Sequence, residues 1–486
     1  MIKNERQYRI TRAQVERFVD ALRRAEKETE RVQPPRLRQA HLDALRSQLI
    51  DLESEVAQYE RLRAGDFHVV EVESFDELPS ALICARIAAG LSQKDLAERL
   101  GMKEQQIQRY EATDYAGASF ARLSDIVKAL GVSIREDVFI PTEQLSIKKF
   151  LARLESLGLD KNFVRNRLSP RDFPPEPATA GDSSTVGDIV FKTASGLRRI
   201  FGWTLAEIMG PSQPTLDLAA AWGARFKLPA NVADRRLSAY SIYAHHLALL
   251  ALESTPNQTP KPIPRDPIEI ATSIRARYGK LTFRTALEYV WDLGIVVLPL
   301  NDGGAFHGAS WRLKGRNVVV LKQQTKSEAR WQFDLFHEVW HAGEEPSLEE
   351  RTILEVPETD PARRNSDEER KASRFAGNVA LEGRAEHLVG LIVSETGGEI
   401  PRFKVALPRI AACEGVSIDS LANYLAFRLS LQGENWWGTA NNLQTPGDPW
   451  AIARDVFLLR SDFSRLNLVD RGLLARALEE RSEVAA

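Results

Sequence analysis

Apolar residues recur every three or four positions along most of the chain, and this pattern predicts helices. Residues 11–65 predict two helices that Pro34 and Pro35 separate. In the second helix the apolar positions alternate three and four residues apart: Leu42, Leu45, Leu49, Leu52, Val56 and Tyr59. Such a seam is typical of paired helices, so it predicts either a hairpin within the chain or a contact between two copies.

A compact run of short helices is predicted over residues 77–133. Within "LSQKDLAERLGMKEQQIQRYEAT", residues 91–113, Ser92 suits a helix cap. Gly101 suits the turn between two helices, because glycine tolerates a left-handed backbone. The apolar residues expected to pack these helices are Leu96, Ala97, Leu100, Ile107 and Tyr110. The pattern predicts an all-α helix-turn-helix domain at the N-terminal side of the chain.

Strand-like runs gather in one region of the chain. "IVVLPL" at 295–300, "GASWRL" at 308–313 and "NVVVLKQ" at 317–323 predict strands, and "KGRN" at 314–317 predicts a hairpin turn. Helices are predicted on both sides of this region. We therefore expect a multidomain, mainly α chain that contains one α+β domain.

Proline-rich stretches at 169–185 and 254–267 predict linkers. The chain of 486 residues is long enough for several buried cores. We divide it into a helical hairpin, a helix-turn-helix domain, a helical connecting region, the α+β domain and a C-terminal extension, over residues 1–70, 71–140, 141–265, 266–432 and 433–486.

Composition narrows the setting in which the chain works. The net charge of −2 excludes a chain-wide basic field, so DNA binding needs a local patch. The two cysteines lie far apart, which favours a reducing compartment and argues against a cysteine-based metal site. The first residues lack an apolar core, and no apolar run is long enough for a bilayer. We expect a cytoplasmic protein.

The segment "FDLFHEVWHAGEE", residues 333–345, contains two histidines four residues apart. A helix turns about 100° per residue, so His337 and His341 project from one face and can share a zinc ion. Glu338 lies beside them, where a carboxylate can take a proton from water and deliver it to a leaving amine. The pattern predicts a zinc site with Glu338 as general base, and Gly343 suits a helix C-cap.

A zinc site needs a third protein ligand, which we expect on the next helix, "SDEERKASRFAGNVAL" at 366–381. Its predicted buried stripe consists of Ala372, Phe375, Ala376 and Val379. Glu369 extends this stripe by one turn, whereas Glu368 points to the side. Because a core-facing carboxylate is costly unless it is paired or bound to metal, we prefer Glu369 as the ligand.

Residues 266–432 resemble the ImmA/IrrE family of bacterial zinc peptidases. The resemblance rests on the strand pair, the His-Glu-x-x-His helix and a later helix with Glu369, Ala372, Ser373, Phe375 and Ala376. It implies a zincin-like fold and an active peptidase with Glu338 as general base. It also implies that Zn²⁺ is held by three side chains, His337, His341 and Glu369.

Two positions depart from the pattern of that family. Trp340 stands where glycine is usual, and Ser373 stands where Asn or Asp is usual. Trp340 is bulky enough to narrow the cleft or to face the core. His307, just before the strand at 308–313, is a candidate for binding substrate or stabilising an oxyanion, and the alternative is a turn histidine. We interpret three further histidines as structural, His245, His246 and His387.

The second helix of the helix-turn-helix leaves polar residues on its outer face. Gln can pair with adenine and Arg with guanine in the major groove. We expect a phosphate contact from Gln93, and DNA contacts from the outer-face residues Lys103, Gln105, Gln108 and Arg109. Residues 77–135 resemble the phage-repressor-type (XRE) domain. The alternative is a module for protein contacts, because five basic and four acidic residues over 84–113 leave a net charge of only +1.

The two motifs together predict a bacterial DNA-binding regulator with a zinc-dependent endopeptidase that cleaves a partner such as a repressor or antitoxin. Its expected partners are double-stranded operator DNA, a protein substrate and a second copy of the chain. The alternative is a transcriptional repressor or antitoxin whose peptidase-like domain is a non-cleaving sensor or dimerisation platform. If the peptidase is active, we expect the substrate to add as a strand along the edge of 308–313.

Overall fold

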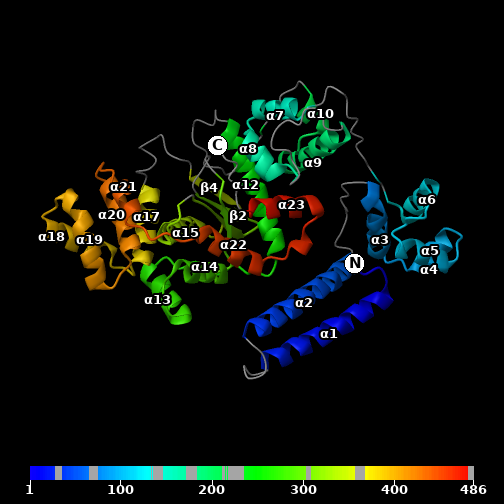
Figure 1. The fold of residues 1–486 in the computed structure, drawn as a ribbon, viewed down its shortest axis with the longest axis horizontal. Helices are drawn as coiled ribbons and strands as arrows, with labels where there is room; N and C mark the ends of the chain where they lie inside the picture. Colours follow the sequence, from blue (N-terminus) through cyan, green and yellow to red (C-terminus); the bar gives the residue numbers. More distant parts are fainter. Residues whose placement is uncertain are drawn as a thin grey trace. The chain divides into compact units, whose positions relative to one another are not determined.

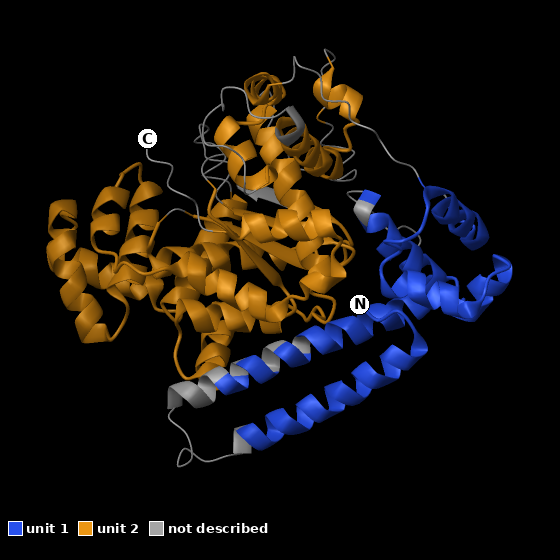
Figure 2. Cartoon of the chain, turned by 45° about the vertical axis from the view of Figure 1, so that its right-hand side comes forward, with its two compact units in different colours: residues 1–138 blue, residues 139–486 orange. Residues whose placement is uncertain are grey.

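A computed structural model describes most of the chain, with gaps. The described residues are 1–27, 35–64, 75–132, 134, 146–170, 183–210, 214, 216, 235–302, 308–323, 325–355 and 367–479. They form two compact units, residues 1–138 and residues 139–486 (Figure 2). Each unit is described separately below.

The first unit consists of helices only in its described part. Its elements are α1 (Glu5–Lys27), α2 (Pro35–Ala64), η1 (Phe75–Glu77), α3 (Leu78–Ala88), α4 (Gln93–Arg99), α5 (Glu104–Ala112) and α6 (Phe120–Leu130). Helices α1 and α2 lie side by side as an antiparallel hairpin (Figure 1). The predicted seam of α2 therefore pairs within the chain.

The hairpin and the short helices share one apolar core. Tyr8 of α1 and Tyr59 of α2 stack with ring centroids 5.1 Å apart, and they join a buried cluster with Leu82 and Ile107. Farther along the hairpin the seam is less covered, since Leu45, Leu49, Leu52 and Val56 are only half-buried. The regions predicted as a hairpin and as a helix-turn-helix thus pack together at one end of the hairpin.

The second unit contains many helices and a four-stranded sheet. Its helices before the sheet are α7 (Ile147–Ser156), α8 (Lys161–Phe163), η2 (Val164–Leu168), α9 (Ser183–Phe201), α10 (Leu205–Met209), α12 (Arg235–Ser254), α13 (Pro267–Tyr278) and α14 (Phe283–Asp292). The strands are β1 (Val296–Leu300), β2 (Gly308–Leu313), β3 (Arg316–Lys322) and β4 (Arg351–Glu355). The remaining elements are α15 (Glu328–Ala342), α17 (Asp367–Ala380), α18 (Ala385–Thr396), α19 (Ile400–Glu414), α20 (Ile418–Ser430), α21 (Trp437–Asn442), α22 (Pro449–Arg460), η3 (Phe463–Arg465) and α23 (Leu468–Ala477).

The sheet has the strand order β1-β3-β2-β4. Strands β2 and β3 form the predicted hairpin, and Lys314 and Gly315 turn it with φ angles of 52° and 73°. β1 pairs parallel to β3, and β4 pairs antiparallel to β2. The edge of β2 along which we expected a substrate strand is not free, because β4 pairs with it over five register pairs.

The two faces of the sheet are covered by different helices. Side chains alternate between the faces of a strand, so Gly308 and Trp311 of β2 lie on opposite faces. Gly308 lies against Glu338 of α15, whereas Trp311 packs against His245 of α12. Helices α15 and α12 therefore sandwich the sheet, and the histidine pair lies on the α15 side.

Both the second proline-rich stretch and the C-terminal extension pack into the second unit. In the stretch at 254–267, the carbonyl oxygen of Thr255 accepts a hydrogen bond from Arg316 of β3, and Thr255 is buried. Trp436 and Trp450 of the extension belong to the same core as the sheet. The extension thus helps to build the body that carries the histidines.

Candidate metal centre and nucleic-acid interface

Helix α15 holds the histidine pair on a rigid base. Ser327 caps its N-terminus by accepting a hydrogen bond from the backbone N–H of Arg330, at 3.0 Å, and it donates to Gln444 of the C-terminal extension, at 2.5 Å. The core-facing side of the helix is fully buried at Trp331, Leu335, Phe336 and Val339. This anchoring leaves the direction of His337 and His341 well defined.

Three predicted ligands, His337, His341 and Glu369, meet at one point. The Nε2 atoms of His337 and His341 are 3.2 Å apart. Glu369 Oε2 lies 3.1 Å from His337 Nε2, and Glu369 Oε1 lies 3.6 Å from His341 Nε2. These side chains form a group with the geometry to hold one metal ion.

Helix α17 supplies the carboxylates, and its predicted buried stripe is confirmed at Ala372, Phe375, Ala376 and Val379. Glu368 and Glu369 are similarly exposed, at 32% and 31% of their side chains. They differ in the atoms they approach. Glu369 faces Nε2 of both histidines, whereas Glu368 lies 3.7 Å from Nδ1 of His341.

A ring of polar groups surrounds the histidine pair. Nδ1 of His337 lies 3.2 Å from Ser373 Oγ, and Nδ1 of His341 lies 3.7 Å from Glu344 as well as from Glu368. Partners of this kind fix the orientation of a ligating imidazole. Arg351 of β4 binds this ring, 2.8 Å from Glu344 Oε2, and donates to the carbonyl oxygen of His341 at 2.6 Å.

The charges of the cluster shift the pKa values of its members. Burial alone would lower the pKa of His341, but the carboxylates of Glu344, Glu368 and Glu369 outweigh it and hold that pKa well above 6.5. Burial would raise the pKa of Glu369, and the two imidazoles hold it far below its usual value instead. Glu369 is therefore an anion at neutral pH, whereas His341 would have to release a proton before its nitrogen could bind a metal ion.

Glu338, the predicted base, is fully buried next to the start of β2. A Cβ atom added to Gly308 would lie 2.2 Å from Glu338 Oε1. Glycine at this position therefore makes room for the carboxylate. The sequence carried no signal for this contact, because Gly308 and Glu338 meet only through the packing of β2 on α15.

Trp340 does not enter the metal cluster. Its ring lies 5.1 Å from the ring of Phe375 and 3.6 Å from the guanidinium of Arg265. Gly343 ends the helix, as predicted, but its φ of −83° is an ordinary right-handed value. A Cβ atom there would lie 2.6 Å from Arg265 Nη1 and 3.3 Å from Ile263, so a larger residue would push the end of the Arg265 side chain aside.

The other histidines stand apart from the cluster, where the structure describes them. His245 is buried against Trp311, and His246 lies 3.2 Å from Asp470. His387 is exposed on α18. His307, predicted as a substrate or oxyanion contact, lies outside the described residues.

The first unit builds the helix-turn-helix as predicted from the sequence. Ser92 caps α4 in a capping box with Asp95, and Gly101 turns the chain with a φ of 63°. Leu96, Ala97 and Ile107 are buried, whereas Tyr110 is half-buried and stacks on Tyr115. On the outer face of α5, four of the predicted reading residues are exposed, Lys103, Gln105, Gln108 and Arg109.

Gln93 and Gln108 also have contacts inside the unit. The Gln93 amide donates to Glu111 at 2.8 Å, so its nitrogen is already engaged by α5. Gln108 donates to Glu104 one turn earlier, also at 2.8 Å. The Gln93 amide nitrogen carries two N–H donors, so a phosphate contact would have to use the second one. Gln105 and Arg109 are exposed on the outer face of α5.

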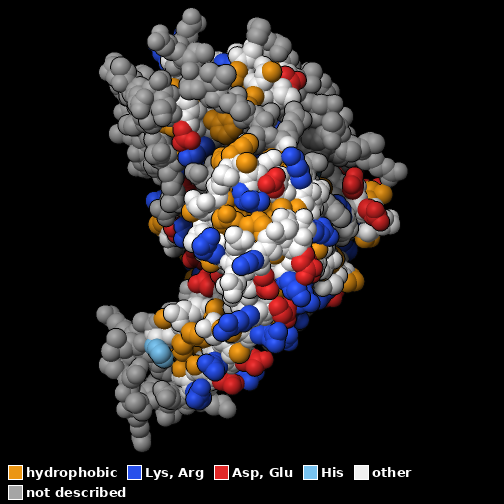
Figure 3. All heavy atoms as spheres, turned by 90° about the vertical axis from the view of Figure 1, so that its right-hand side faces the viewer, with side chains coloured by type: hydrophobic (Ala, Val, Ile, Leu, Met, Phe, Trp, Pro, Cys, Tyr) orange, Lys and Arg blue, Asp and Glu red, His pale blue; other side chains and the backbone are white. Residues whose placement is uncertain are grey.

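A buried ion pair between Arg86 and Glu111 ties α3 to α5. The guanidinium donates to the carboxylate at 2.6 and 2.8 Å, and the two side chains are 3% and 0% exposed. Sequence reasoning counted both as surface charges. The remaining surface charges are of both signs. In Figure 3 basic and acidic side chains are interspersed over the visible face.

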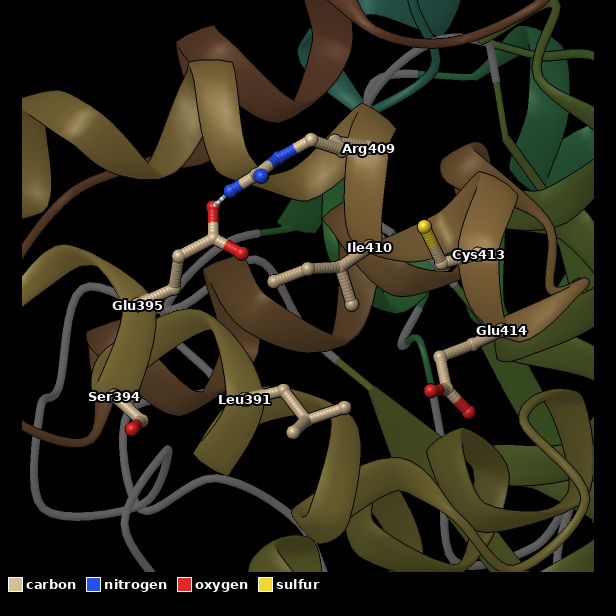
Figure 4. A pocket seen from close by; sticks show the side chains of 7 residues that line it. All are labelled: Leu391, Ser394, Glu395, Arg409, Ile410, Cys413 and Glu414. Atoms are coloured by element: carbon tan, nitrogen blue, oxygen red, sulfur yellow. Dashed lines mark ion pairs between the residues drawn. The ribbon is translucent and has the colours of Figure 1, made fainter.

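A separate surface pocket of about 280 Å³ lies between α18 and α19. Figure 4 shows Arg409 reaching across to Glu395, with Leu391, Ile410 and Cys413 among the other side chains that line the pocket. It shares no residue with the metal cluster. The pocket is therefore separate from the histidine pair.

Comparison with known proteins identifies one part of the chain. Residues 85–136 match the helix-turn-helix family model, so this segment is a DNA-binding helix-turn-helix. No curated protein and no solved structure matches the chain. Among the described helices, none combines the length and the apolar character needed to cross a bilayer.

Proposed function

We propose that the protein is a DNA-binding regulator whose second unit is a zinc-dependent endopeptidase that cleaves a partner protein, such as a repressor or antitoxin. The helix-turn-helix match supports the first part. The second part is supported by one observation, the convergence of His337, His341 and Glu369 beside the buried Glu338. The sequence resemblance to ImmA/IrrE peptidases points to the same residues.

The spacing of the ligand atoms suits zinc. Ligand atoms around a tetrahedral zinc ion with bonds near 2.05 Å lie about 3.3 Å apart. In the cluster the corresponding separations are 3.1, 3.2 and 3.6 Å. Two imidazoles and one carboxylate also match a common catalytic zinc site, which leaves a position open for water or substrate. His337, His341 and Glu369 would hold the ion.

The proposed reaction is hydrolysis of a peptide bond. Zinc, when bound, supplies a Lewis acid that polarises the scissile carbonyl and acidifies the attacking water. Glu338 accepts a proton from that water while the water oxygen adds to the carbonyl carbon. As the C–N bond breaks, Glu338 delivers the proton to the leaving nitrogen, which departs as an amine, and the other fragment keeps the new carboxylate.

DNA recognition would come from the outer face of α5. Gln105 and Arg109 would contact base edges, and Lys103 a phosphate. One such module neutralises few phosphates, so a second copy of the chain would strengthen binding.

The metal and peptidase parts are tested together on the purified full chain. We expect one zinc per chain, loss of zinc in His337→Ala, and retained zinc in Glu338→Gln. Incubation with proteins encoded beside the gene should give cleavage by wild type and none by Glu338→Gln. A chain that cannot take up zinc would exclude the metal site, and full zinc without Glu338-dependent cleavage would exclude the peptidase.

A second candidate function is a repressor or antitoxin whose second unit is a non-cleaving sensor or dimerisation platform. It is favoured by the complete burial of Glu338 and His341, both 0% exposed. This candidate predicts that Arg109→Ala abolishes the cellular phenotype while His337→Ala leaves it intact. The peptidase proposal predicts that both variants lose it.

A further inference from the structure

Strand β4 occupies the side of β2 that an extended peptide would need. It runs antiparallel to β2 in a continuous register from Arg312↔Arg351 to Gly308↔Glu355. An edge strand offers unpaired backbone N–H and C=O groups, and peptides are often captured by pairing with them. In this chain β4 pairs with those backbone groups of β2.

Both ends of β4 lie beside the proposed catalytic groups. At one end, Arg351 donates to the carbonyl oxygen of His341 and binds Glu344, and it lies 3.5 Å from Glu368. At the other end, Glu355 is the register partner of Gly308, the glycine that makes room for Glu338. The strand thus spans the site from the second histidine to the base.

The proposed catalytic groups on α15 are closed to solvent in this structure, although the Glu369 side chain on α17 is 31% exposed. Glu338 and His341 are 0% exposed and His337 is 7% exposed. The cavity between His341, Arg312 of β2 and Arg351 of β4 leaves no room for a water molecule. A polypeptide substrate cannot reach the base in this arrangement, so a part of the chain must move aside first.

We propose that the substrate is an extended polypeptide segment that replaces β4 along β2, and that β4 is an internal stand-in which keeps the site closed. The inference rests on the proposed peptidase function and adds its substrate form and its control. Backbone pairing with β2 would bind many sequences, because it uses main-chain groups. The scissile bond lies next to the substrate residue that pairs with Gly308, because Gly308 is the β2 residue in contact with Glu338.

A reversible disulfide between β2 and β4 tests this proposal. Ala309 and Leu354 are register partners, and Ala309 lies on the sheet face opposite Gly308, away from the metal cluster. The zinc-loaded full chain with Ala309→Cys and Leu354→Cys would be prepared in a Cys413→Ser background, because Cys413 is exposed. The Ala309→Cys single variant is the matched control.

Two measurements report the effect of the disulfide between β2 and β4. The first is cleavage of fluorescently labelled unfolded casein and of partner proteins, and the second is the rate at which a chelator removes zinc. We expect both rates to be at least tenfold lower in the oxidised double variant, and to recover on reduction. The single variant should not respond to reductant. Equal rates in the oxidised and reduced forms would overturn the proposal.

A variant that weakens β4 gives the opposite test. Ile353→Pro removes a backbone N–H from the middle of the strand, so it should loosen β4 and raise both rates without reductant. Tryptophan emission confirms that the second unit is folded. If zinc is bound and its removal is slower in the oxidised double variant, but no variant shows Glu338-dependent cleavage, then the peptidase and the substrate assignment both fail. If cleavage occurs at the same rate with and without the disulfide, only the role of β4 fails.

Discussion

The buried ion pair between Arg86 and Glu111 gives a sharp stability prediction for the first unit. The Arg86 guanidinium donates twice to Glu111, at 2.6 and 2.8 Å, and also to the carbonyl oxygens of Leu91 and Lys3, at 2.7 and 2.6 Å. Arg86→Met keeps the aliphatic stem but removes all four donors. It leaves Glu111, which is 0% exposed, without its cation.

The expected loss follows from this burial. Removing one partner of a buried ion pair costs about 3–5 kcal/mol, because the remaining charge stays uncompensated. Domains of this size are stable by roughly 5–15 kcal/mol, so the first unit should lose a large part of its stability. The double variant Arg86→Met, Glu111→Leu removes both charges and should regain most of the loss, since apolar replacements of buried pairs are often neutral.

The sequence provides an internal control for the measurement. All nine tryptophans lie between Trp203 and Trp450, in the second unit. Urea unfolding followed by far-ultraviolet circular dichroism should show the transition of the first unit shifted in Arg86→Met, while tryptophan emission stays unchanged. A loss below about 1 kcal/mol, the value of a surface ion pair, would refute the reasoning.

Three further predictions concern packing, pH and DNA. Gly377→Ala should cost about 1–3 kcal/mol in tryptophan-monitored unfolding, because its Cβ would lie 2.0 Å from Tyr424, whereas Gly390→Ala, with open space, should not. Burial, with a smaller effect of the neighbouring histidine, lowers the pKa of His245 to about 4. The unfolded chain therefore binds this proton first, and roughly 3 kcal/mol of stability should be lost as pH falls from 6.5 to 4. His245→Met should lack that part of the decline; an unchanged pH profile would contradict the assignment. Arg109→Ala should weaken operator binding by about 1–3 kcal/mol at fixed salt, with zinc content unchanged, and equal affinity would remove Arg109 from the interface.

Local sequence signals predicted the local parts of this molecule. The helix cap at Ser92, the turn at Gly101 and the buried stripe of α17 follow from short-range rules, and the structure confirms them. The approach of Glu369 to the histidine pair could be anticipated for the same reason, because one buried stripe fixes the direction of a whole helix face.

Features that depend on distant pairing could not be predicted in this way. Arg86 and Glu111 look like surface charges until α3 and α5 pack, because charge counting ignores tertiary contacts. Strand β4 is only five residues long, and its place beside β2 is a choice among possible partners that no short pattern specifies. Gly308 has a role only because β2 crosses α15 at Glu338.

Trp340, the bulky residue within the histidine motif, does not cover the site. Trp340 packs between Arg265 and Phe375, so its ring joins α15 to α17 and to the segment before α13. A smaller residue there would loosen that joint but would not uncover Glu338, which lies under Gly308. Glu338 is buried against the sheet instead, next to Gly308 of β2. In the proposal above β4 is the element that closes the site, so a substitution at Trp340 should change stability more than access.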